Sequence, residues 1–328
     1  SLVLKVVKVP ASHPVLQVAE RLDGRLKKAF LLAVANVKDQ ITLNKLAEAI
    51  QSGDILVTLA LLAIDRRFTE ALQGKGLEAN IISLREAIQE TYAAGAQAAM
   101  DMLPRTARIG TSFDLVNQES VRFLNSYNFN LINGISQESR DAVQQIVIRA
   151  FKEGGSPMQQ ARQIKQAIGL TPRMELAVQN YRRGLESGEL SGLRQALTRS
   201  LRDGRYDPTL LRALDDEKEL GQKRIDAMAE RYASRYLDYR ATNIARTESI
   251  RASAAGQQEL WRQARQQGYL ADDAQRVWIA SKDERTCPIC MGLDGERAGL
   301  DEEFQRGIMQ PPDPHPSCRC TVALAKAA

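Results

Sequence analysis

Apolar residues recur at spacings of three and four along most of the chain, from about residue 15 to residue 279. One such run comprises Val18, Leu22, Leu26, Ala29, Ala33 and Val37. In an α-helix this spacing puts the side chains on one face, so each run predicts a helix that buries that face. The chain has 328 residues, a length that suggests two domains, although one large helical domain is not excluded. We therefore expect a mainly α protein.

Helix-breaking residues divide this pattern into segments. Pro104 is expected to end a helix that includes the small residues 93–99, along which a neighbouring helix can approach closely. Asn133-Gly134 is expected to interrupt the chain before Ser136, a candidate N-cap. Gly154-Gly155-Ser156-Pro157 then indicates a helix-turn-helix connection. Most helix pairs of this kind are packing units rather than DNA readers, and we favour packing here.

Two longer helical stretches follow. Residues 171–207 are typical of a helical hairpin, and residues 217–267 of one long helix. Tyr232, Tyr236 and Tyr239 lie on the apolar stripe of that helix, with arginines between them. Tyrosines with this spacing can stack on nucleobases, but a stripe at helical spacing usually belongs to a core.

After Gly268 the sequence changes character. Residues 276–280 are short, β-branched and aromatic, which predicts a strand, and residues 320–324 predict a second one. Turn residues lie between the two. We therefore expect an elongated multi-helix body that carries a small C-terminal α+β unit with a β-hairpin.

Charge and motifs exclude several functional classes. The net charge is +5, with +7 between residues 140 and 265 and −3 between 266 and 328. Acidic and basic residues are interleaved in the basic part, which is typical of a solvated helical surface rather than a nucleic-acid groove. The longest apolar runs, such as residues 59–64, are far shorter than the roughly 20 residues of a membrane span. No GxxxxGK[ST], GxGxxG or GxSxG motif occurs, so nucleotide-binding and hydrolase functions have no support.

The N-terminal segment does not have the pattern of a secretory signal. Residues 1–8 are apolar, but lysines interrupt them and Pro10 follows. We therefore expect synthesis in a cytoplasm, where thiols stay reduced and clustered cysteines more often hold a metal than form disulfides.

All four cysteines lie near the C-terminus, where they form one cluster with a histidine. The cluster consists of Cys287, Cys290, His315, Cys318 and Cys320. These soft and borderline donors suit a tetrahedral zinc ion, which takes four thiolate or imidazole ligands. One of the five is therefore surplus, and the sequence does not select it. Disulfides, or reduced thiols packed in a small core, are the alternatives.

A zinc ion here can be structural or catalytic. A catalytic ion needs an open coordination position and a nearby base, for which Asp283, Glu284 and Asp294 are close in sequence. Acidic residues in a solvated loop are equally well explained without catalysis, so we favour a structural site. Such an ion would stabilise a tail of about 60 residues that buries little apolar surface.

Five short motifs follow one another along the chain, from the long helix to the end of the cysteine cluster. They are Ile244-Ala245-Arg246-Thr247-Glu248-Ser249, Val277-Trp278-Ile279-Ala280, Asp283-Glu284-Arg285-Thr286-Cys287-Pro288-Ile289-Cys290, Leu293-Asp294-Gly295 and His315-Pro316-Ser317-Cys318-Arg319-Cys320. This ordered series resembles the head-morphogenesis (Mu F-like) minor head proteins of tailed bacteriophages. On this resemblance we expect a Mu F-like domain at residues 136–325, within which residues 276–325 form the Cys/His-rich unit. Residues 1–135 resemble no family and are expected to be a helical region without an assigned role.

The resemblance implies a non-enzymatic virion component, present in few copies, that acts in procapsid assembly and in later DNA delivery. Its implied place is inside the head, at or near the portal, after synthesis in the host cytoplasm. The implied partners are the portal protein, the major capsid or scaffolding protein, and packaged DNA in non-specific contact. The alternative hypothesis is a zinc-stabilised nucleic-acid-binding protein that acts on packaged DNA, and a zinc hydrolase is the least favoured of the three.

Four residues of the motif series are expected to have structural roles: Arg246, Glu248, Trp278 and Asp283. Arg246 and Glu248 are candidates for buried ion pairs, with Asp283 or Glu284 as mates. Such pairs would lock the tail onto the long helix. The alternative is a surface Arg–Glu pair, which contributes only about 0.5 kcal/mol.

Overall fold

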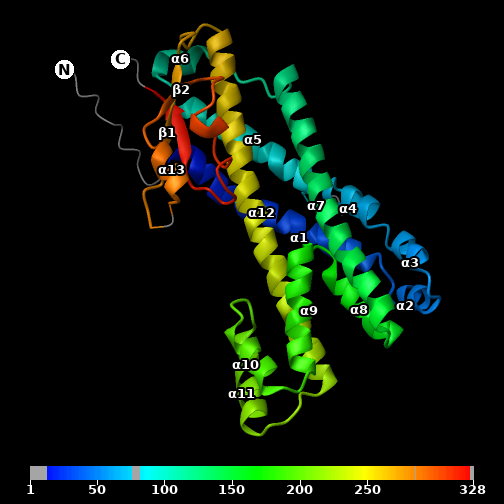
Figure 1. Ribbon diagram of the computed structural model, residues 1–328. Helices are drawn as coiled ribbons and strands as arrows, with labels where there is room; N and C mark the ends of the chain where they lie inside the picture. Colours follow the sequence, from blue (N-terminus) through cyan, green and yellow to red (C-terminus); the bar gives the residue numbers. More distant parts are fainter. Residues whose placement is uncertain (1–12, 76–81, 285, 326–328) are drawn as a thin grey trace. The chain divides into compact units, whose positions relative to one another are not determined.

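The computed structural model describes residues 13–75, 82–284 and 286–325 (Figure 1). The N-terminal residues 1–8, Pro10 and Arg285 of the motif series therefore lie outside the described residues. The protein is mainly α-helical, with a small three-stranded antiparallel sheet near the C-terminus, as the sequence predicted. Among the described helices, none combines the length and the apolar character that crossing a membrane requires.

Helices precede the sheet in the chain. The N-terminal ones are α1 (Pro14–Asp39), α2 (Leu43–Gln51), α3 (Ile55–Leu62), α4 (Ile64–Leu72), α5 (Leu84–Met102), α6 (Arg105–Gly110) and α7 (Gln118–Glu153). The next are α8 (Pro157–Ala167), α9 (Pro172–Glu186), α10 (Leu190–Thr198), the 3₁₀ turn η1 (Gly204–Tyr206), α11 (Asp207–Asp215) and α12 (Gln222–Gln266). The C-terminal elements are β1 (Gln275–Ile279), α13 (Pro288–Leu293), β2 (Arg297–Gly299), η2 (Gln305–Gly307) and β3 (Thr321–Leu324).

Contacts within the chain define two compact units. Unit 1 contains the described residues of 1–29, 82–129 and 242–328, and unit 2 those of 30–81 and 130–241. The long helices α1, α7 and α12 contribute residues to both units. The predicted division at residue 135/136 concerns the extent of a family domain, and it stays a prediction.

In unit 1, α5 and α12 cross in backbone contact. A Cβ atom placed on Gly256 of α12 would lie 1.9 Å from the Tyr92 carbonyl oxygen of α5. One placed on Gly95 of α5 would lie 2.3 Å from the Ser253 carbonyl oxygen of α12. Both distances are far below van der Waals contact, so only glycine fits at these two positions. The close approach predicted for the small residues 93–99 is confirmed.

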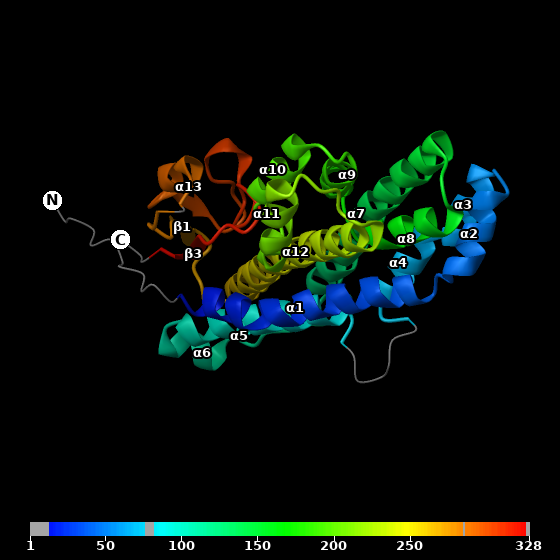
Figure 2. The same cartoon turned by 90° about the horizontal axis from the view of Figure 1, so that it is seen from below.

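The sheet has the order β2-β1-β3, and it lies beside the C-terminal half of α12 (Figures 1 and 2). β1 and β3 pair antiparallel with Trp278 opposite Val322, which confirms the two strands predicted from the sequence. Buried glutamines of α12 hold this sheet: Gln257 Nε2 donates to the Val322 carbonyl (3.2 Å), and Gln258 Nε2 donates to the Leu300 carbonyl. The sheet is thus attached to the helix by hydrogen bonds as well as by apolar contacts.

Arg276 of β1 is fully buried in unit 1 and organises the loop that follows β2. Its guanidinium donates to the carbonyls of Gly299 (3.1 Å), Glu302 and Met309 (2.8 Å), and it lies 5.0 Å from the centre of the Phe304 ring. Buried carbonyl groups without a partner are costly, so one arginine satisfies the backbone that a short loop leaves unpaired.

The predicted break at Asn133-Gly134 is wrong, because α7 runs without interruption through both residues and through Ser136. Glycine costs a helix about 1 kcal/mol relative to alanine. Burial of Ile132 and Ile135 on either side outweighs this cost, since both are almost completely buried. Ser136 is a buried residue inside the helix rather than its N-cap.

Other helix boundaries of unit 2 follow the sequence signals. The predicted helix-turn-helix connection joins α7 and α8: Gly154 and Gly155 have positive φ angles, Ser156 is the N-cap residue and Pro157 begins α8. The predicted helical hairpin corresponds to α9 and α10, whose break includes Gly188.

The tyrosines of α12 divide between core and surface. Tyr232 is 2% exposed and packs against Tyr181 with the rings tilted by 33° and their centres 4.4 Å apart. Tyr236 packs edge-on against Tyr232, whereas Tyr239 is half exposed. Core packing, the favoured interpretation, therefore holds for Tyr232 and Tyr236.

Candidate metal centre

The CxxC pair is placed by the start of a short helix in unit 1. Cys287 is the N-cap residue of α13, and its Sγ accepts a hydrogen bond from the backbone N–H of Cys290 at 3.4 Å. Pro288 fills the first helical position, where its missing N–H leaves no partner unsatisfied. One helical turn therefore brings both sulfur atoms to the same end of α13.

The segment that carries the other donors is fixed on α12. The Ser317 backbone N–H donates to Thr247 Oγ1 at 2.9 Å, and the Asp313 carboxylate lies 3.6 Å from the Arg251 guanidinium. His315 Nδ1 lies 2.9 Å from the carbonyl oxygen of Pro316. This contact fixes the imidazole ring and leaves Nε2 available for another partner. A second hydrogen bond of this kind is typical of metal-binding histidines.

The five predicted donors come together around Cys290. Its Sγ lies 3.5 Å from His315 Nε2 and 3.6 Å from Cys318 Sγ. For two ligands of one tetrahedral zinc, bond lengths of about 2.3 Å (Zn–S) and 2.0 Å (Zn–N) give separations of roughly 3.5–3.8 Å. Both measured separations therefore fit ligands that share one ion.

Two overlapping groups of three donors result. Cys287, Cys290 and His315 lie within 4.8 Å of one another, and so do Cys290, Cys318 and Cys320. All four cysteines are free thiols in the structure, so the disulfide alternative is not the arrangement described here. Cys290 belongs to both groups, which makes it the central donor of the cluster.

Burial controls the ionisation of these thiols. It raises the pKa of Cys290 to about 12, because a thiolate is poorly solvated there. A hydrogen bond from the Cys318 thiol to Cys320, together with burial, raises the pKa of Cys318, and the same hydrogen bond lowers the pKa of Cys320 to about 6. An ionised Cys320 thus opposes ionisation of Cys290 and Cys318. A divalent cation reverses this balance, since it stabilises several thiolates together.

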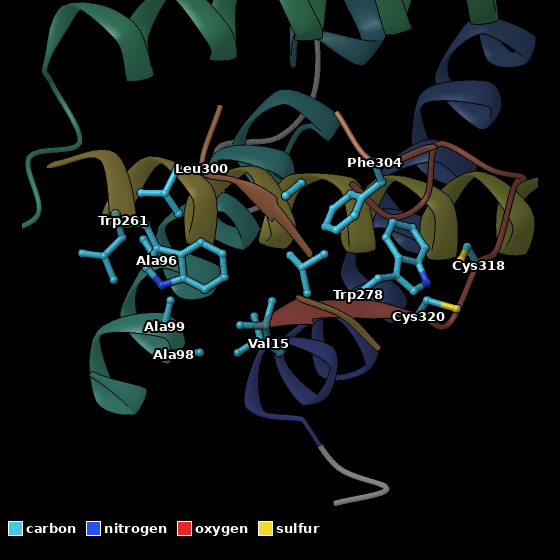
Figure 3. Close-up of a cluster of buried hydrophobic side chains, with 14 of the residues drawn as sticks. Val15, Ala96, Ala98, Ala99, Trp261, Trp278, Leu300, Phe304, Cys318 and Cys320 are labelled. Carbon is cyan, nitrogen blue, oxygen red and sulfur yellow. The ribbon is translucent and has the colours of Figure 1, made fainter. Parts of the chain in front are cut away.

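Aromatic residues close one side of the cluster. Trp278 of β1 is fully buried, and it packs edge-on against Phe304 with ring centres 5.5 Å apart. Figure 3 shows both rings in the same apolar cluster as Cys318 and Cys320, with the indole directed toward Cys320. Trp278, predicted to have a structural role, therefore lies in the wall of the donor cluster.

The predicted ion-pair lock is wrong in its partners. Arg246 has a side chain that is 58% exposed, and it lies 3.9 Å from Asp23 of α1. Glu248 is buried and lies 3.6 Å from Arg251, while Asp283 pairs with Arg319. Arg246 faces solvent because its neighbours Ala245 and Thr247 occupy the buried side of α12. The tail is held on α12 by Thr247, Arg251 and the two buried glutamines instead.

Sequence reasoning missed Arg276 and Thr247. The signal for Arg276 was present, because Arg276 and Trp278 of β1 and Ala280 just after it are alternate residues and all three are buried. Residues two apart in a strand point to the same face, so a buried Trp278 predicts that Arg276 is buried too. Thr247 lies in the motif series between two charged residues, and nothing in the sequence around it indicates a hydrogen bond to Ser317.

Two of the three carboxylates that could serve a catalytic zinc, Asp283 and Asp294, are engaged elsewhere. Asp294 lies 2.7 Å from Lys282 and accepts a hydrogen bond from the Ala280 backbone N–H at 3.0 Å. Asp283 pairs with Arg319, as described above. These contacts organise the loop between β1 and α13, which supports a structural role for the cluster.

Comparison with protein families gives one match. Residues 191–323 match the family of phage Mu protein F like proteins. The match contains all five donors and the whole motif series, so the resemblance noted in the sequence is confirmed over these residues. A search of curated proteins found no match, and a search of solved structures found none either.

Proposed function

Residues 191–323 belong to the phage Mu protein F-like family, and on this basis we propose that the protein is a minor head protein of a tailed bacteriophage. In this proposal it is a non-enzymatic virion component that acts in procapsid assembly. The observation that carries the proposal is the family match over the ordered motif series, which ends with the donor cluster.

The proposed place of the protein is inside the head, at or near the portal, after synthesis in the host cytoplasm. Its proposed partners are the portal protein and the major capsid or scaffolding protein, with packaged DNA in non-specific contact. A role in later DNA delivery belongs to the same proposal.

The donor cluster is proposed to hold one structural zinc ion. Cys290 would be one ligand because it belongs to both donor groups, and three of Cys287, His315, Cys318 and Cys320 would be the others. When bound, the ion supplies a cross-link between α13 and the segment that precedes β3. One of the five donors is then surplus, and Cys320 lies next to Trp278 in the wall of the site.

Co-purification with the portal protein of the same phage tests the main proposal. The two proteins are co-expressed with a tag on the portal protein alone, and the complex is analysed by size-exclusion chromatography. We expect the chain to elute with the portal oligomer. Separate elution of two intact, folded proteins would count against a portal-associated role.

A second candidate function is a zinc-stabilised nucleic-acid-binding protein, which one feature of unit 2 favours. Arg205, Arg231 and Arg235 surround Asp203, and their side chains are 69%, 51% and 48% exposed. Hydrogen bonds from the Arg205 guanidinium hold the pKa of the Asp203 carboxyl well below its usual range, so Asp203 stays ionised. Its single negative charge is nevertheless shared by three guanidinium groups. Positive charge is therefore left at the surface, as phosphate contacts require.

A salt-dependent gel-shift assay separates the two functions. Nucleic-acid binding as the main function predicts tight binding that Arg205→Ala and Arg231→Ala weaken. Weak binding without sequence preference, abolished at moderate salt, would leave the head-protein proposal ahead.

A further inference from the structure

Two glutamines of α12 bind an extended segment of the chain through its backbone N–H and C=O groups. Gln263 accepts from the Asp114 N–H (2.7 Å) and donates to the Asp114 carbonyl (3.1 Å). Gln267 makes the same two bonds with Ser112, at 2.9 and 2.8 Å. Each carboxamide thus satisfies both backbone groups of one residue, as a neighbouring strand would.

The spacing explains why the pair works. Residues four apart on an α-helix are displaced by about 6.0 Å along its axis. Alternate residues of an extended chain are about 6.6 Å apart. Two glutamines at positions i and i+4 therefore match alternate residues of an extended peptide, and side chains of the peptide play no part in this match.

Two glutamines with the same spacing occur on α8, without a hydrogen-bonded segment of the described chain. Gln159 and Gln163 are half-buried, and both line a cavity of about 300 Å³ in unit 2. Neither carboxamide makes a hydrogen bond within residues 13–75, 82–284 and 286–325. We call this space the glutamine cavity; its other walls include Ala150, Gly154, Gly155, Gln160, Glu186 and Gln222.

The walls of the glutamine cavity are fixed, and one side is open. Gln160 Nε2 donates to the carbonyls of Ala150 (2.9 Å) and Gly154 (2.5 Å), which holds the loop between α7 and α8. A Cβ on Gly154 would meet no atom within 4 Å, and one on Gly155 would meet only the Gln160 amide at 3.8 Å. Chain can therefore pass over the two glycines without a clash.

The charges of the lining are already paired. Arg149 lies 3.0 Å from the buried carboxylate of Glu175, and Glu186 lies 3.4 Å from Arg182. A lining of carboxamides and paired charges favours an uncharged polar ligand over a phosphate or a cation, because both charged residues of the described lining, Arg149 and Glu186, already have ionic partners.

We propose that the glutamine cavity binds an extended peptide segment of a partner protein, through the backbone N–H and C=O groups of alternate residues. Gln159 and Gln163 would act as Gln263 and Gln267 do within the chain. Recognition of this kind tolerates many peptide sequences, as strand addition to a sheet edge does. The proposal depends on neither the zinc site nor the family match.

A peptide whose backbone the protein already holds is the natural probe. A fluorescein-labelled heptapeptide Thr-Ser-Phe-Asp-Leu-Val-Asn, copied from residues 111–117, is titrated with the full chain and followed by fluorescence anisotropy. We expect saturable binding that the double variant Gln159→Ala/Gln163→Ala weakens at least tenfold, since four hydrogen bonds to the peptide backbone are lost.

Two controls isolate the backbone contacts. Gln166→Ala removes a glutamine of the same helix that does not line the cavity, and it should bind as the unaltered protein does. A peptide methylated on the two backbone nitrogens that correspond to Ser112 and Asp114 should bind at least tenfold more weakly, because it lacks the N–H donors. Absence of saturable binding, or binding that survives the double substitution or the methylation, would overturn the proposal.

Discussion

Replacing Gly256 by alanine tests the helix crossing on which unit 1 is built. The new Cβ would lie 1.9 Å from the Tyr92 carbonyl oxygen and 3.1 Å from the Ala96 nitrogen. Both are backbone atoms of α5, so no side chain can rotate to make room. Ordinary contact begins near 3.4 Å, and α5 and α12 must therefore separate by roughly 1.5 Å at this point.

The expected cost follows from this separation. Overpacking a core costs about 1–3 kcal/mol, and two rigid backbones place Gly256→Ala at the upper end. The higher helix propensity of alanine offsets about 1 kcal/mol of this cost, so the free energy of unfolding should fall by about 2 kcal/mol. Gly24 of α1, in the same unit, provides the matched control, because a Cβ there meets nothing within 4 Å. Gly24→Ala should raise the free energy of unfolding by about 0.5–1 kcal/mol.

Urea denaturation followed by circular dichroism measures both variants. The predicted difference between the two substitutions is about 3 kcal/mol, with opposite signs relative to the unaltered protein and an unchanged slope. If Gly256→Ala were as stable as Gly24→Ala, the backbone contact between α5 and α12 would be refuted as a determinant of stability.

Three further predictions follow from unit 1. Protein purified without chelator should contain one zinc per chain by elemental analysis, and Cys290→Ser should abolish it because Cys290 belongs to both donor groups; retention of zinc by Cys290→Ser would exclude Cys290 as a ligand. Arg276→Leu should lower the free energy of unfolding by about 2 kcal/mol or more in urea, because it leaves three part-buried carbonyls without this donor; an unchanged midpoint would contradict this. Burial raises the pKa of Glu248 from 4.5 to about 7, so the folded state binds the proton of this carboxyl more tightly than the unfolded state does. The stability that this tighter proton binding contributes is lost as the pH rises from about 4.5 to 7. Between pH 5 and pH 8, the free energy of unfolding should therefore fall by roughly 2–3 kcal/mol less in Glu248→Gln than in the unaltered protein, as measured by paired urea titrations. Parallel pH profiles of the two proteins would count against a buried, ionisable Glu248.

Much of the fold was predictable from periodicity. The two strands that pair as β1 and β3 were found because β-branched and aromatic residues concentrate there. The helix-turn-helix connection was found because glycine and proline restrict backbone angles locally. β2 was missed because its three residues, Arg297–Gly299, are too short to show alternation, and only pairing with β1 defines them.

Predictions failed where tertiary contacts outweighed a local signal. Asn133-Gly134 looked like a break, but the buried isoleucines around it continue the helix. The five donors of the candidate metal centre were identified by their chemistry, since few other roles require thiols and imidazole at such spacing. Their grouping around Cys290 depends on how α13 and the segment after residue 309 fold together on α12, which spacing alone does not specify.

Quantitative mass spectrometry of purified procapsids and virions tests the central claim most directly. The chain is measured against the portal protein of the same particles, with the major capsid protein as the internal standard. We predict that it is present in both kinds of particle, in few copies and in a constant ratio to the portal. Its absence from both particles, while it accumulates in the infected cell, would contradict a role as a head protein.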